Sequence, residues 1–159
     1  MRNWILGIAV VMAAFSTASA RADEEKVALD KVPKAVISAA KAKYPGAKLT
    51  EAAKEVEKGK TTYEVSLTTV DKRKIDATFK PDGTLVLTEE TIEVKDLPKV
   101  VSAAVKAKYP KGKMKSAEKL VEGDEVSYEV VVAIEGKKDI EVVVDPKGKI
   151  EEPEDDEKK

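Results

Sequence analysis

The sequence aligns with itself without a gap when it is shifted by 65 residues. Residues 33–85 then lie over residues 98–150, and 21 of the 53 aligned pairs are identical. Solenoids stack three or more units, so a long period that occurs only twice indicates a duplicated small domain. A unit of about 60 residues buries only about 60% of its unfolded surface and is marginally stable alone. We therefore expect two units that pack together or share one sheet.

Each unit has the pattern of one helix followed by four strands. Apolar residues within 97–105 recur at the three- and four-residue spacing of one helical face. Both helices are expected to end at Tyr44 and Tyr109, because proline disfavours helical geometry in the residue before it. Apolar residues then alternate with a period of two over 61–69 and 126–134, which predicts half-buried strands. Short turns between the strands make them antiparallel.

The expected fold class is α+β, a tandem duplication of a helix plus four-stranded antiparallel sheet unit, with helices on one face and the other face open. The helix of the first unit is expected to cover the side of the strands that carries Tyr63, Val65 and Phe79. Residues 48–56 and 113–121 do not alternate strictly, so they are predicted to form bulged strands.

The N-terminus has the features of a secretory signal peptide. Arg2 precedes an apolar stretch from Trp4 to Phe15, and small residues end at Ala20. We expect cleavage after Ala20 and a mature chain that begins at Arg21 in the periplasm or outside the cell. The alternative is an uncleaved N-terminal anchor. The expected organisation is a signal peptide (1–20), an N-terminal linker (21–29), a first unit (30–92), a second unit (93–152) and an acidic disordered tail (153–159).

The composition argues against catalysis. Histidine and cysteine are both absent, which removes the usual general base, the usual zinc ligands and the Cys/His nucleophiles. The carboxylates are expected in turns, on solvated faces and in the tail, so we predict no enzyme activity, no cofactor and no dedicated metal site. The 29 basic and 30 acidic residues balance, so nothing in the charge attracts nucleic acid. No membrane span is expected after signal removal, and the oligomeric state stays open.

The order of motifs resembles the PepSY-like family, small exported bacterial domains also described as β-lactamase-inhibitor-like. The resemblance covers residues 30–152 and implies a helix packed on a four-stranded antiparallel sheet, used twice. The tandem is similar in outline to β-lactamase inhibitor proteins, which implies a protein-binding role. The motifs that carry the resemblance are Val32-Pro33-Lys34, Tyr44-Pro45-Gly46-Ala47-Lys48, Tyr63-Glu64-Val65 and Pro81-Asp82-Gly83, with the counterparts Leu97-Pro98-Lys99, Tyr109-Pro110, Tyr128-Glu129-Val130 and Pro146-Lys147-Gly148.

The open sheet face is the expected binding surface for an envelope or extracellular protein, including a hydrolase that the chain would inhibit. Val131 and Val143 are expected to be exposed there as an apolar strip, and the flanking carboxylates favour a basic partner. Thr84 and Thr88 are expected on the same face. The candidate partner-binding residues are Glu64, Ser66, Thr78, Glu129, Val131, Glu141 and Val143.

Two alternatives remain open at this point. The open face can be an ordinary solvated surface of a structural or stress-related envelope protein with no dedicated partner site. The acidic turns and the tail can also bind cations weakly, although no spacing typical of a calcium loop is present.

Overall fold

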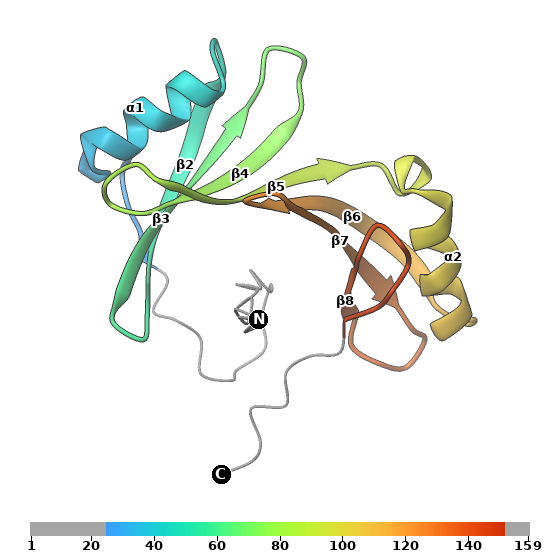
Figure 1. The fold of residues 1–159 in the computed structure, drawn as a ribbon. Coiled ribbons are helices and arrows are strands. Elements are labelled where there is room, and N and C mark those ends of the chain that lie inside the picture. Colours follow the sequence, from blue (N-terminus) through green and yellow to red (C-terminus); the bar gives the residue numbers. More distant parts are fainter. Residues whose placement is uncertain (1–24, 152–159) are drawn as a thin grey trace, which may run out of the picture.

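The computed structural model describes residues 25–151, where the chain forms an α+β fold with one eight-stranded antiparallel sheet and two α-helices (Figure 1). The expected signal peptide and acidic tail lie outside the described residues. The order of strands across the sheet is the order along the chain, from β1 to β8. The elements are β1 (Glu25–Lys26), a 3₁₀ turn η1 (Leu29–Lys31), α1 (Lys34–Lys43), β2 (Lys48–Glu57), β3 (Lys60–Thr68), β4 (Lys74–Phe79), β5 (Leu85–Ile92), a 3₁₀ turn η2 (Val94–Asp96), α2 (Lys99–Lys108), β6 (Lys113–Glu122), β7 (Glu125–Ala133) and β8 (Ile140–Val144).

The two helices end where the sequence predicts. Tyr44 is the C-cap of α1 and Tyr109 is the C-cap of α2, each directly before a proline. The backbone N–H of Tyr44 still donates a hydrogen bond to the carbonyl of Ala40 at 3.0 Å. Proline then stops the helix because it disfavours helical geometry in the preceding residue.

Each helix packs on its own part of the hydrophobic core. Val36 and Ala40 of α1 are fully buried against β3 and β4, and Val101 and Val105 of α2 are buried against β6, β7 and β8. Phe79 is the largest side chain that is almost fully buried, with 1% of its surface exposed. Tyr63, expected on the side that the helix covers, and its counterpart Tyr128 are half-buried at the margins of the two clusters.

Both helices cover the same face of the sheet. Ile75 in the first cluster pairs with Glu90, Glu90 pairs with Lys119, and Lys119 pairs with Tyr128 beside the second cluster. Directly paired residues of antiparallel strands point to the same face, so these four positions share the side of the helices. Figure 1 shows the sheet bending so that both helices lie on its outer, convex side. The helix-free face therefore lines the concave side.

Strands β2 and β6 each contain a β-bulge, as predicted from their sequences. The pairing register shifts between Leu49 and Glu51 in β2, and between Met114 and Ser116 in β6. The turn between β4 and β5 requires glycine at Gly83, where φ is +87° and an added Cβ would lie 2.8 Å from the carbonyl oxygen of Ala35.

Two expectations about the strands are wrong. A further register shift at the β4–β5 pair, between Thr78 and Phe79, changes which residues of β5 face the helices. Thr88 consequently pairs with Ala77 and lies on the helix side, although it was expected on the open face. The fourth strand expected in the second unit is reduced, within residues 25–151, to a single bridge between Val144 and Ile150.

Candidate protein-binding face

Strands β3 to β8 each place at least one carboxylate on the helix-free face. The pairing registers connect these positions across the sheet from β3 to β8. We call this surface the acidic face and define it by Glu64, Asp76, Glu89, Glu118, Glu129 and Glu141.

Two pairs of these carboxylates lie directly opposite each other on neighbouring strands. Asp76 of β4 pairs with Glu89 of β5, and Glu118 of β6 pairs with Glu129 of β7. Directly opposed side chains have Cβ atoms about 5 Å apart, and like charges in this arrangement destabilise a sheet. The acidic face therefore concentrates negative charge instead of dispersing it.

Burial strengthens this repulsion at two positions. Glu89 is 5% exposed and Glu129 is 6% exposed. Burial, with the charges of Glu118, Glu64, Glu129 and Asp76, raises the pKa of Glu89 to about 8. Burial also raises the pKa of Glu129 to about 7, and the charges of Glu141 and Glu118 add to the shift. Both carboxyl groups are therefore partly protonated near neutral pH.

The pKa of Glu118 is raised as well, first by burial and then by the charges of Asp76 and Glu141. Within residues 25–151, no hydrogen bond or ion pair involves the side chain of Glu89, Glu118 or Glu129. Buried charges in proteins are ordinarily paired. This part of the acidic face therefore concentrates carboxylates that pair with no cation among the described residues. Their oxygens keep contact with solvent, because no fully buried side-chain N or O atom among the described residues lacks a hydrogen-bond partner.

All seven predicted partner-binding residues lie on the helix-free face, but in two separate groups. Glu64, Ser66 and Thr78 come from β3 and β4, whereas the other four come from β7 and β8. Strands β5 and β6 lie between the groups and contribute Glu89 and Glu118, which sequence reasoning missed. The pairing of β5 with β6 joins the two halves of the sheet, and no local motif in either strand shows that register.

The expected exposure of the apolar strip is wrong at one of its two positions. Val143 lies on the helix-free face, opposite Glu129, but only 3% of its surface is exposed. Val131 is half-buried. The face is concave (Figure 1), and side chains converge on a concave surface, which reduces the exposure of those at its centre. The solvent-exposed valine strip is therefore not present.

The part of the chain that the structure describes also bears on a metal site and on a membrane span. No group of three or more His, Cys, Asp or Glu side chains there is arranged to hold a metal ion. In the same range, neither α-helix has the length and hydropathy needed to span a membrane.

Comparison with solved structures identifies proteins of the same fold. A BLIP-like protein from Bacteroides fragilis is 21% identical, with a TM-score of 0.60 over 75% of this chain and 82% of that chain. A DUF2874 family protein from Bacteroides uniformis is 17% identical, with a TM-score of 0.63 over 74% and 85%. A protein from Bacteroides eggerthii, described as "putative periplasmic", is 18% identical, with a TM-score of 0.64 over 75% and 85%.

Two family models match the amino-acid sequence itself. The model for PepSY, "Peptidase propeptide and YPEB domain", matches residues 33–84. The model described as "Putative beta-lactamase-inhibitor-like, PepSY-like" matches residues 71–152, which is more than half of the chain. A comparison with curated proteins finds no match. The resemblance expected from the motif order is confirmed, and the chain belongs to the PepSY-like family.

Proposed function

We propose that this chain is an exported, non-enzymatic binding module whose acidic face binds a basic surface of a partner protein in the cell envelope. A hydrolase that is inhibited by this contact is one such partner. The observation that carries the proposal is the cluster of the buried carboxylates Glu89 and Glu129 with the half-buried Glu118, which have no cationic partner among residues 25–151.

The electrostatics of the face support a basic partner. In the free protein, repulsion and burial hold protons on Glu89 and Glu129. A lysine or arginine side chain inserted between them would stabilise the charged carboxylates and form charge-assisted hydrogen bonds. Complementary charge also speeds encounter with the right partner and disfavours the wrong ones. Binding should strengthen as pH rises through about 7 to 8, because the carboxylates that attract the cation become ionised.

The location and the binding role have separate support. The signal-peptide features of residues 1–20 favour export, and the Bacteroides eggerthii relative is described as periplasmic. The family model is described as beta-lactamase-inhibitor-like, and the Bacteroides fragilis relative is described as BLIP-like. Inhibitors of enzymes bind proteins through preformed surfaces, and the concave sheet offers such a surface (Figure 1).

Retention of partners from the host's own exported proteins tests the proposal. The protein would be purified as exported, its first residue read from the intact mass and expected to be Arg21, and then immobilised. We expect it to retain basic proteins at low salt and to lose them as salt rises, because screening weakens contacts between charged surfaces. The double variant Glu89→Gln/Glu129→Gln should lose the retained proteins, since it removes the two most buried charges.

The matched control is Glu135→Gln, which removes one carboxylate from the exposed turn between β7 and β8. This variant should retain the same proteins as the unmodified chain. If the double variant also retains them, the acidic face is not the binding surface. If retention is lost equally in both variants, only the net charge of the molecule matters.

We further infer that residues 30–92 and 93–152 are copies of one unit. The helices α1 and α2 begin 65 residues apart, and so do β2 and β6 and also β3 and β7. An experimental structure should superpose the equivalent Cα atoms of the two halves at this constant offset. If superposition required a changing offset outside the loops, the two halves would not be copies of one unit.

A further inference from the structure

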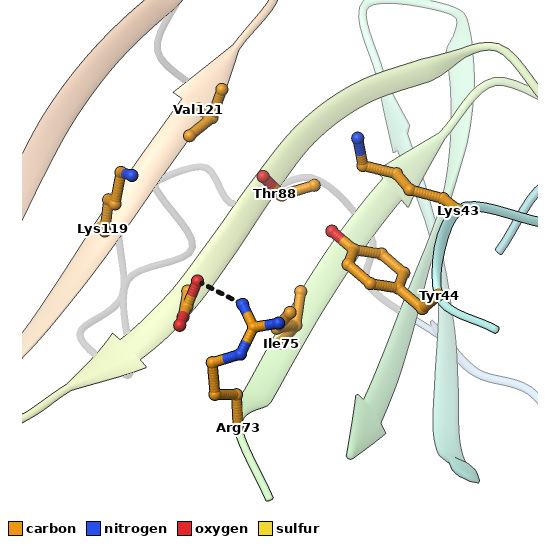
Figure 2. Close-up of a pocket in the computed structure, with 8 residues that line it drawn as sticks. Lys43, Tyr44, Arg73, Ile75, Thr88, Lys119 and Val121 are labelled. Atoms are coloured by element: carbon orange, nitrogen blue, oxygen red, sulfur yellow. Dashed lines mark hydrogen bonds and ion pairs between the residues drawn. The ribbon is translucent and has the colours of Figure 1, made fainter. Parts of the chain in front are cut away.

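A pocket of about 230 Å³ lies on the helix side of the sheet, where the first unit meets the second (Figure 2). It is formed by the end of α1, by the start of β4 and the turn before it, and by strands β5 and β6. This face is opposite to the acidic face. The lining residues are Lys43, Tyr44, Arg73, Ile75, Thr88, Glu90, Lys119 and Val121.

The pocket carries an excess of positive charge. Its carboxylate, Glu90, accepts from the Nη1 of Arg73 at 3.2 Å, and the Nε of Arg73 also donates to Asp71 at 2.8 Å. Arg73 is thereby neutralised by its own neighbours. Lys43 and Lys119 form no ion pair with another residue of the described range 25–151. The Nζ of Lys43 lies 5.8 Å from the centre of the Tyr44 ring, a distance that leaves the ammonium group able to contact an anion, as Lys119 also can.

Two hydroxyl groups lie between these charges. Figure 2 shows the phenol of Tyr44 pointing toward Thr88 from the α1 side. Burial raises the pKa of Tyr44, and the charge of Glu90 adds to the rise, while Thr88 and Arg73 oppose it. The phenol therefore stays protonated at neutral pH and can donate a hydrogen bond. A hydroxyl donor beside cations suits the oxygen atoms of an anionic group.

The remaining lining is apolar. Ile75 is 3% exposed and Val121 is half-buried. They line the pocket from β4 and β6, on either side of the β5 residues Glu90 and Thr88. Ligand sites in proteins combine an apolar lining with a few convergent polar groups. We propose that this pocket binds a small organic anion, with its carboxylate between Lys43, Lys119 and the Tyr44 phenol and with its apolar body on Ile75 and Val121.

The pocket depends on the junction between the units, which has no counterpart after the second unit in the described range. Lys108, Tyr109 and Ile140 stand 65 residues after Lys43, Tyr44 and Ile75. In the pocket, β6 supplies Lys119 and Val121. After β8, residues 25–151 contain only the bridge between Val144 and Ile150, so no strand of the described range takes the place of β6 there. The second unit therefore repeats the helix end without repeating the pocket, which provides matched controls at Lys108 and Tyr109.

Benzoate is a suitable probe, because it joins a carboxylate to a compact apolar ring. Titration into the ¹⁵N-labelled mature chain should shift the backbone amide signals of β5, β6 and the end of α1. We expect a dissociation constant in the millimolar range, which is usual for a ligand of about ten heavy atoms. Benzyl alcohol lacks the charge and inorganic phosphate lacks the apolar body, so each should bind more weakly than benzoate at the same residues.

Benzoate affinities of four variants distinguish binding in this pocket from nonspecific attraction of anions to the positively charged surface. Lys43→Gln/Lys119→Gln should weaken benzoate binding by about tenfold, because each partly exposed charge contact contributes a factor of a few. Tyr44→Phe should weaken it further by removing the donor. The counterparts Lys108→Gln and Tyr109→Phe should leave it unchanged. The proposal is overturned if benzoate shifts signals elsewhere or nowhere, if benzyl alcohol or phosphate binds as tightly, or if the double variant keeps full affinity.

Discussion

Raising the pH from about 5 to about 9 is expected to destabilise the folded protein by an amount on the order of 4 kcal/mol, mainly through Glu89. The pKa of Glu89 is about 8 in the folded protein, compared with an ordinary value of 4.5. Between these two values the folded state keeps a proton that the unfolded chain has already lost. The folded state therefore binds more protons in this window, and its stability falls as pH rises.

Glu129 acts in the same direction over a narrower window, because its folded pKa is about 7. The two groups repel each other, so their contributions are coupled and do not simply add. Below the ordinary carboxyl pKa both states are protonated and the contribution of these groups is fully present. Above about pH 8 it is lost, because the buried carboxylates are charged beside like charges.

The measurement is urea unfolding at a series of pH values, for the unmodified chain and for Glu89→Gln. Glutamine has the shape of a protonated glutamate, so the variant should match the unmodified chain near pH 5 and be the more stable of the two near pH 9. Glu135→Gln, in an exposed turn, should keep the pH dependence of the unmodified chain. A stability that stays flat or rises from pH 5 to 9 would contradict the assigned burial of Glu89.

Much of the fold follows from local sequence. The Tyr-Pro pairs end both helices, and the broken alternation of residues 48–56 and 113–121 marks the bulges. These features depend on the backbone chemistry of one or two residues, so they can be read without knowing the tertiary structure. The α+β class and the family resemblance depend on the same local patterns.

The acidic face could be predicted only in part. Glu64 and Glu129 stand in the strand motif Tyr-Glu-Val, so their face follows from alternation. Glu89 could not be assigned, because the register shift after Thr78 changes the phase of β5 without any glycine or proline to mark it. Contacts between distant strands fix such a register, and a single strand does not contain that information.

The solvent exposure of side chains on the helix-free face is the second feature that the local sequence pattern does not predict. Ser66 and Val131 align with each other at the 65-residue offset of the sequence, and so do Thr78 and Val143. The first pair is half-buried and the second is buried, whether the side chain is polar or apolar. Burial on the helix-free face is thus a property of position in the curved sheet. Alternation predicts which face a residue occupies but not how deeply that face is enclosed.

Substitution of Val143 by aspartate is expected to destabilise the protein by about 4 kcal/mol or more. Removal of a buried valine loses roughly 2 kcal/mol of hydrophobic stabilisation. The new carboxylate is then placed opposite Glu129, where a like charge in a buried setting adds a further penalty. Val131→Asp, at a half-buried position opposite Glu141, should cost about half as much.

The matched variant Val143→Lys isolates the electrostatic part of this cost. It loses the same valine contacts but places a cation opposite Glu129, so we expect a loss of only about 2 kcal/mol. Urea unfolding of both variants at neutral pH gives the difference. That difference measures the potential that a basic partner would meet on the acidic face. If aspartate and lysine cost the same, the potential is negligible and the proposed partner chemistry loses its basis; if neither has a cost, Val143 is exposed after all.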